Sequence, residues 1–177
     1  YLNRSTYQGN PSTDDFNNLT DPVSDSGTNK WTFRNGSVAN HLNERSEIPG
    51  RVTWQYAASG DLFTYDAVSN MLDGSITLTG WGVKPGRAMA IVFRYASATD
   101  YWFISFNPAD NTTAQLYYHD AGGDHAVGSV QTSTVSLCLK DGTFNAVVVL
   151  NGAQVIVTTS CGASFTFDSG TTYARHP

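Results

Sequence analysis

From residue 31 onward, short runs of β-branched and aromatic residues alternate with turn dipeptides, and this alternation restricts the possible folds more than any other feature. The runs recur at intervals of about 8 to 12 residues. Asp-Gly, Asn-Gly, Gly-Gly and Pro-Gly pairs separate them, and these residues tolerate the backbone angles of tight turns. No stretch carries the apolar stripe of a helix. We therefore predict an all-β chain that folds as an antiparallel two-sheet β-sandwich or jelly roll.

The same pattern divides the chain into three parts. Residues 1–30 are mostly polar and predict an extended N-terminal arm, residues 31–168 predict the β-sandwich domain, and residues 169–177 predict a polar tail. The predicted strands are 31–34, 51–56, 62–65, 75–81, 88–95, 101–106, 114–118, 135–139, 144–150, 154–159 and 164–167.

One predicted hairpin brings together residues that could form a binding surface. A five-residue loop over 96–100 would join its two strands. This register sets Arg94 opposite Trp102 on one face and Phe93 opposite Phe103 on the other.

Composition limits the classes of partner. Only 14% of the residues are charged and the net charge is -5, which argues against binding to duplex nucleic acid. No apolar run approaches the roughly 18 residues of a membrane span, so we expect no membrane insertion. The surface must be rich in uncharged polar residues, which favours an extracellular, secreted, virion or cell-surface location. The chain begins at Tyr1, and we expect a processed or excised piece.

The chain has two cysteines, Cys138 and Cys161, in segments that both read as strands or their ends. They could form one disulfide between neighbouring strands in an oxidising compartment. The alternative is two buried thiols that act as small hydrophobic side chains.

Several motifs, taken in order, resemble a known superfamily. DDFN at 14–17, WTF with NG at 31–36, and VFRY followed by DYWF within 92–103 precede DGTF and VIV within 141–157. This order, over roughly 14–168, resembles the laminin-G-like, concanavalin-A-type jelly rolls of secreted bacterial and phage-tail modules. The resemblance implies a jelly-roll fold, with glycan binding, adhesion, virion architecture or, in some branches, polysaccharide cleavage. The family's usual last strand does not follow, so it is missing or supplied elsewhere.

Catalysis has little support in the sequence. A retaining glycosidase needs two carboxylates about 5 to 5.5 Å apart, yet Glu44 and Glu47, the two glutamates of the chain, lack strand-like spacing. The tripeptide at 45–47 resembles one piece of an alginate-lyase motif, without the accompanying strands. No G-x-S-x-G elbow occurs. We do not expect an enzyme, and polysaccharide lyase or hydrolase activity stays the least favoured alternative.

Sugar binding has better support. Sugar rings pack on flat aromatic side chains, and the chain has four Trp and nine Tyr. Arg94 beside Trp102, with Tyr117 and His119 on an adjacent strand, could form such a face. Trp81, between two glycines in a predicted turn, is a further candidate. The alternative is that Arg94 packs on Trp102 as a cation–π pair and that Trp102 seals the sandwich.

The segment around 121–123 is nearly palindromic. If these residues form a hairpin tip, His119 faces His125 and Asp120 faces Asp124. Two like charges directly opposite each other are unfavourable, so a bound cation at Asp120 and Asp124 would relieve them. The alternative is a mobile, solvated tip.

Two further kinds of site are predicted near the surface. Asp14, Asp15 and Asn17 could hold a structural Ca²⁺, because calcium prefers oxygen ligands. The N-x-Ser/Thr pattern also gives candidate glycosylation sites. These are Asn3, Asn18, Asn35 and Asn111.

These observations favour a non-catalytic carbohydrate-binding or adhesion module of a secreted or surface-displayed protein. The competing hypothesis is a structural subunit of a virion fibre, decoration or extracellular filament. In that case the arm 1–30 would contact a neighbouring subunit, and a homo-oligomer would result.

Overall fold

The computed structural model describes part of the chain, which divides into two compact units, 1–69 and 70–177. For residues up to 65 and for 79–81 the description is of the backbone. The described residues are 31–35, 42–44, 52–54, 62–65, 73–81, 89–107, 109–139 and 144–170.

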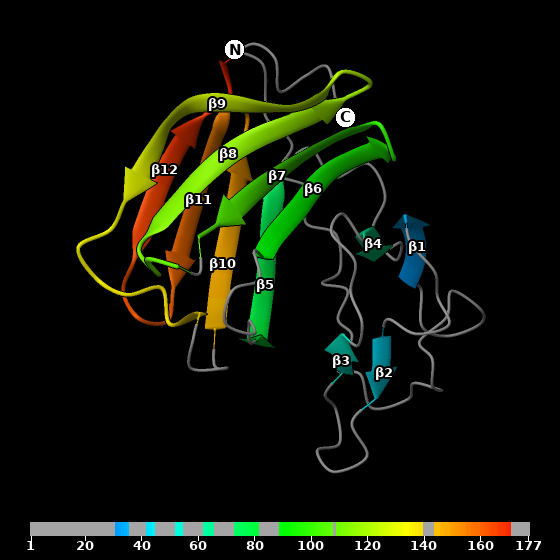
Figure 1. Cartoon of the computed structure of the whole chain (residues 1–177). Coiled ribbons are helices and arrows are strands. Elements are labelled where there is room, and N and C mark those ends of the chain that lie inside the picture. The colour runs from blue at the N-terminus through cyan, green and yellow to red at the C-terminus, as the bar shows by residue number, and fades with distance from the viewer. Residues whose placement is uncertain are drawn as a thin grey trace. The chain divides into compact units, whose positions relative to one another are not determined.

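The first unit contains two antiparallel strand pairs (Figure 1). β1 (Trp31–Asn35) pairs with β4 (Leu62–Tyr65), and β2 (Leu42–Glu44) pairs with β3 (Val52–Trp54). The predicted arm 1–30 lies outside the described residues.

The second unit is a β-sandwich, as Figure 1 shows, and the predicted fold class is confirmed. Sheet I has the strand order β12-β11-β10-β5, and sheet II has the order β6-β7-β8-β9. All the strand pairs are antiparallel. Sheet I comprises β5 (Gly74–Trp81), β10 (Phe144–Asn151), β11 (Gln154–Thr159) and β12 (Ser164–Asp168). Sheet II comprises β6 (Met89–Ser97), β7 (Asp100–Phe106), β8 (Thr113–Asp120) and β9 (Gly123–Thr132).

The core lies between these two sheets and is built by strand alternation. Successive side chains of a strand point to opposite faces, so every second residue turns inward. Trp102, Ile104 and Phe106 of β7 are fully buried, and so is Val148 of β10, while Leu150 is 2% exposed. Burial of each large apolar side chain contributes about 1.5 to 3 kcal/mol to folding. Among the described residues, no helix is long and apolar enough to cross a membrane.

The predicted strand at 135–139 is wrong. The apolar alternation there fills the core without forming a ladder: Leu137 and Leu139 are fully buried, but their backbone amides bond to Asn111. The Leu137 amide donates to the Asn111 carbonyl at 2.8 Å, and the Leu139 amide donates to the Asn111 Oδ1 at 3.0 Å. Cys138 between them has a φ of 61°. This segment is therefore a loop that closes one end of the sandwich.

Cys138 and Cys161 form a disulfide, with their Cα atoms 6.2 Å apart. The bond joins the loop that follows β9 to the turn between β11 and β12. The sequence left open either a disulfide or two buried thiols, and the structure contains the disulfide. A structural disulfide indicates an oxidising environment.

The β6–β7 hairpin differs from its predicted register. The turn has two residues, Ala98 and Thr99, so Ser97 pairs with Asp100, and Phe93 pairs with Trp102. A bulge between Phe93 and Ser97 takes up the extra residues of β6. The predicted pairing of Arg94 with Trp102 is therefore wrong. A bulge followed by a tight turn replaces the regular five-residue loop.

β9 was not predicted as a strand. It is an edge strand, and most of its residues are exposed or half-buried. Such a strand needs few of the β-branched and aromatic residues from which strands are predicted.

Candidate functional site

Sheet II presents a cluster of aromatic side chains on the face away from the core. Trp102, Ile104 and Phe106 of β7 point inward, so Tyr101 and Phe103 point outward.

The cross-strand register aligns further rings with these two. Tyr101 lies opposite His119, and Phe103 lies opposite Tyr117. Tyr95, in the bulge of β6, contacts Tyr101. We call the five half-buried residues Tyr95, Tyr101, Phe103, Tyr117 and His119 the aromatic face.

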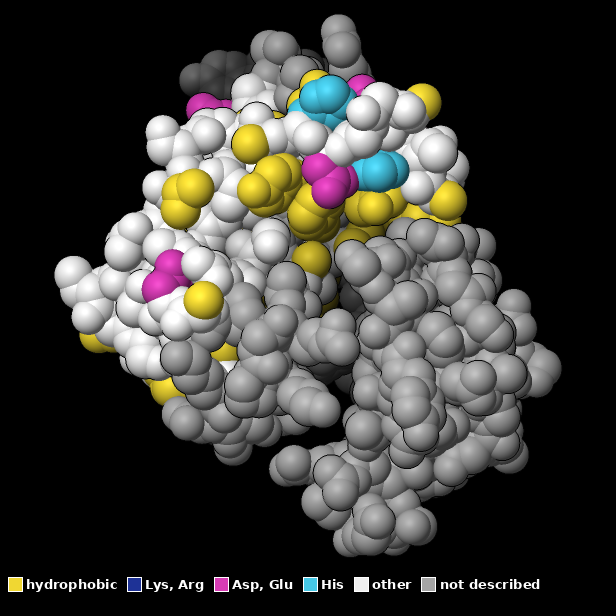
Figure 2. All heavy atoms as spheres, in the orientation of Figure 1, with side chains coloured by type: hydrophobic (Ala, Val, Ile, Leu, Met, Phe, Trp, Pro, Cys, Tyr) yellow, Lys and Arg dark blue, Asp and Glu magenta, His cyan; other side chains and the backbone are white. Residues whose placement is uncertain are grey.

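The rings of the aromatic face form a continuous set of contacts. The centroids of Phe103 and Tyr117 are 4.9 Å apart at an interplanar angle of 7°, and those of Tyr101 and His119 are 4.7 Å apart at 16°. Tyr95 and Tyr101 are stacked at 6.0 Å. Ring faces therefore meet each other across the strands of sheet II. In Figure 2, hydrophobic side chains gather on this side of the molecule beside histidine and acidic side chains.

One His–Asp pair borders the aromatic face. His119 Nδ1 lies 2.6 Å from Asp124 Oδ1, and the two side chains are 23% and 57% exposed. The bond holds the imidazole in its stack on Tyr101. Burial, followed by the nearby charge of Asp124 and by Tyr95, raises the pKa of the Tyr101 phenol. At neutral pH this hydroxyl can therefore both donate and accept hydrogen bonds.

A second His–Asp pair lies on the opposite face of the same hairpin. His125 Nε2 lies 2.8 Å from Asp120 Oδ1, and the His125 ring stacks on Tyr118 with centroids 4.6 Å apart. The backbone amide of Gly122 donates to the same carboxylate at 2.7 Å. The bond from His125, and then that from Gly122, lowers the pKa of Asp120.

These two pairs correct the predicted hairpin tip. The turn comprises only residues 121 and 122, so His119 lies opposite Asp124 and Tyr118 lies opposite His125. Each imidazole therefore meets a carboxylate, and the two carboxylates bond on opposite faces. The argument for a cation shared by Asp120 and Asp124 no longer holds. Within the described parts of the chain, no group of three or more His, Cys, Asp or Glu side chains could hold a metal ion.

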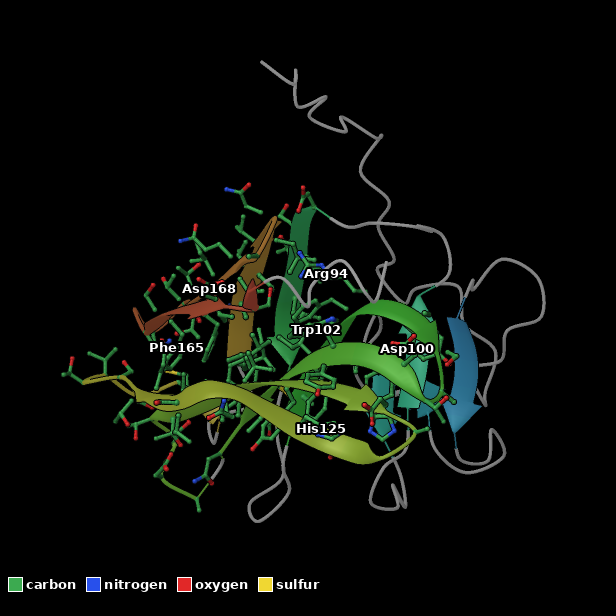
Figure 3. All side chains as sticks on the ribbon, turned by 90° about the horizontal axis from the view of Figure 1, so that it is seen from above. Arg94, Asp100, Trp102, His125, Phe165 and Asp168 are labelled. Atoms are coloured by element: carbon green, nitrogen blue, oxygen red, sulfur yellow. A yellow bond between two sulfur atoms is a disulfide. The ribbon has the colours of Figure 1, made fainter. Side chains whose placement is uncertain are left out.

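Of the residues predicted to bind sugar, Tyr117 and His119 lie on the aromatic face, whereas Arg94 and Trp102 do not. Trp102 is fully buried and Arg94 is 4% exposed, so neither can stack on a ligand. Figure 3 shows both between the two sheets. The Arg94 Nη2 donates to the carbonyl of Gly152 in the turn after β10 at 2.6 Å, and its guanidinium lies over the Phe93 ring at 5.9 Å from the centroid.

Trp81 is the last residue of β5, and its backbone pairs with that of Phe144. It therefore belongs to the strand predicted over 75–81 and not to a turn between the two glycines.

Asn111 is not an available glycosylation site in the folded chain. It is 9% exposed, and its Nδ2 donates to the Ser136 Oγ at 2.8 Å. Its Oδ1 accepts a bond from Leu139. Asn35 lies in β1, where only the backbone is described. The remaining predicted glycosylation and calcium residues lie outside the described residues: Asn3, Asn18, Asp14, Asp15 and Asn17.

As sugar-binding residues, sequence reasoning missed Tyr95, Tyr101, Phe103 and Asp124, the last of which it had assigned to a cation. Tyr101 and Phe103 could have been found, because an inward Trp102 forces both of its neighbours outward. Tyr95 and Asp124 depend on a bulge and on a hairpin register that no local pattern specified.

The described second unit is thus an antiparallel two-sheet β-sandwich with an aromatic cluster on one outer face. Neither protein-family profiles nor curated proteins match this sequence. Among solved structures, the chain is similar to the carbohydrate binding module CBM66 from Bacillus subtilis. The TM-score is 0.57 at 13% identity, over 79% of this chain and 80% of that chain. At this identity the likeness establishes the fold.

Proposed function

We propose that this chain is a non-catalytic carbohydrate-binding module and that it binds a glycan on the aromatic face. The observation that carries the proposal is the continuous set of half-buried rings on the outer face of sheet II. Carbon-bound hydrogens of a sugar ring pack well against aromatic surfaces, and polar groups around them fix the sugar's orientation. The tyrosine hydroxyls and the His119–Asp124 pair supply such groups. The similar fold of a protein named as a carbohydrate binding module supports the proposal.

The proposal includes a more specific class and location. We assign the chain to the laminin-G-like, concanavalin-A-type jelly rolls, with a lectin-like or adhesive role in a secreted or surface-displayed protein. The two four-stranded antiparallel sheets and the disulfide support this assignment. The alternative of a virion or filament subunit depends on the arm 1–30, which lies outside the described residues, and it stays a prediction.

Glycan-array binding by the whole chain tests the function. We expect selective binding to one glycan class, and Tyr117→Ala should weaken it about tenfold by removing a ring from the stack. Val130→Ala is the matched surface control, because Val130 is a 58% exposed apolar residue of the neighbouring strand β9. A blank array from a folded chain would overturn the proposal. Repeating the assay with EDTA shows whether binding requires a structural Ca²⁺.

A further inference from the structure

Among the described residues of the second unit, the exposed side chains that are charged at neutral pH are acidic. Its described part contains six aspartates but only one arginine and no lysine. That arginine, Arg94, has a fully buried side chain. Figure 2 accordingly shows acidic and histidine side chains, and no Lys or Arg, among the described atoms of the visible face. A ligand on this face therefore meets carboxylates, without a described lysine or arginine to balance a negative charge of its own.

At the β9 edge of the aromatic face, a small side chain lies beside Tyr117. Tyr117 stacks on Phe103 of β7 through one ring face, and on its other side the cross-strand neighbour is Ala126. Ala126 is exposed and offers only a methyl group. Asp124, two residues earlier on the same strand, points to the same face and bonds to His119. We call this place, bounded by Tyr117, Ala126 and Asp124, the notch.

We infer that the notch is a subsite for a single uncharged sugar residue and that it discriminates against anionic sugars; this inference rests on the proposed carbohydrate-binding function. The sugar packs a C–H face on the open side of Tyr117 above the Ala126 methyl. A sugar hydroxyl donates to the Asp124 carboxylate, which has a lone pair free beside the His119 bond.

The negative charge of Asp124 disfavours the binding of anionic sugars. Proteins that recognise carboxylates or sulfates meet them with arginine or lysine. Here a uronate carboxylate or a sulfate group would instead lie close to the 57% exposed side chain of Asp124. At a separation of a few ångströms in water, this repulsion weakens binding roughly threefold to tenfold.

A first experiment tests whether the sugar binds at the notch. Ala126→Leu fills the notch with a larger side chain on an exposed strand, and it should weaken binding of the best array glycan at least about tenfold. Ala90→Leu is the matched control, because Ala90 is exposed on the strand at the other edge of the same sheet. We expect the control to change affinity less than about twofold. Equal affinities for both variants and the parent chain, each shown to be folded by circular dichroism, would overturn the placement.

A second experiment tests whether the charge of Asp124 weakens the binding of anionic sugars. Calorimetry compares neutral hexasaccharides of glucose, xylose and mannose with hexamers of galacturonate and mannuronate. We expect a neutral probe to bind at least about threefold more tightly than any anionic probe, with the difference shrinking at high salt. Asp124→Asn keeps a hydrogen-bond acceptor for His119 but removes the charge, so it should shrink the difference at low salt.

The outcomes separate this inference from the proposed function. Anionic probes that bind as well as neutral ones, or a ratio unchanged in Asp124→Asn, would overturn the inference and leave carbohydrate binding intact. A folded chain that binds no probe of either charge, and no glycan on the array, would count against carbohydrate binding itself.

Discussion

At the scale of single residues, Arg94 shows how one side chain links the two sheets. Its φ is 47°, in the left-handed region that side chains other than glycine rarely adopt. Its fully buried guanidinium bonds to the Gly152 carbonyl and lies 3.8 Å from Asp73. The bulge of sheet II is thus held against the β10–β11 turn of sheet I.

We therefore expect Arg94→Met to lower the free energy of unfolding by about 1 to 3 kcal/mol, because it leaves the Gly152 carbonyl without this donor. Urea denaturation followed by tryptophan fluorescence measures the change. Val130→Ala, at an exposed position, should stay within about 0.5 kcal/mol of the parent. An equally small change in Arg94→Met would show that the link is not stabilising.

The second residue-scale prediction concerns Tyr101, whose ordinary pKa is 10.0 and is raised by burial, by Asp124 and by Tyr95. A phenol with a raised folded-state pKa contributes stability below its unfolded pKa, and this contribution is lost as pH rises above that value. Asp124→Asn should lower the pKa of Tyr101 towards its ordinary value. Tyrosinate absorbance, with Tyr101→Phe to identify the band, checks this. A titration that is identical with and without the Asp124 charge would contradict the predicted coupling.

At the scale of elements, Gln131 joins β9 of sheet II to the edge strand β12 of sheet I. Its Oε1 accepts from the Thr166 amide at 3.0 Å, and its Nε2 donates to the Thr166 carbonyl. A side-chain amide here takes the place of a neighbouring strand, which protects an otherwise open sheet edge.

Gln131→Ala should remove both bonds and cost about 1 to 2 kcal/mol of stability. Amide hydrogen exchange is the sharper measurement, because the Thr166 amide should exchange faster, while the Val157 amide, inside the sheet, should not. Gln154→Ala is a suitable control, since Gln154 is an exposed glutamine on sheet I. Unchanged exchange at Thr166 would exclude the edge-protecting role.

The strands of the sandwich also show which elements could be predicted from the sequence. Strands such as 144–150 and 154–159 were predictable because their apolar, β-branched runs end at a clear Asn-Gly turn. β9 was not, because an exposed edge strand needs no apolar pattern. The loop 135–139 was predicted as a strand because its apolar residues alternate, and Leu137 and Leu139 are both buried in the core.

The candidate site was predictable only in part, because register decides which side chains share a face. A shift of one residue moves a side chain to the other face of a sheet. The bulge after Phe93 breaks the predicted pairing of Arg94 with Trp102, and alternation along β7 turns Trp102 inward with Ile104 and Phe106. The prediction that Tyr117 and His119 share one face does not depend on that hairpin, because it follows from alternation along β8.

At the scale of the whole molecule, stability and binding should be separable. The disulfide joins two loops at a sequence separation of 23 residues. The aromatic face, by contrast, is built entirely on β6, β7 and β8. Each stack there depends on cross-strand pairing within sheet II and contains neither cysteine.

Replacing both Cys138 and Cys161 by serine should therefore lower the free energy of unfolding by about 3 kcal/mol, since the unfolded chain loses a loop constraint of that size. Thermal unfolding with and without a reducing agent measures this change, and the serine variant should no longer respond to the reductant. Below its unfolding transition, the variant should bind the array-selected glycan within about twofold of the parent. A much larger loss of affinity in the folded variant would place the glycan near the disulfide instead of on the aromatic face.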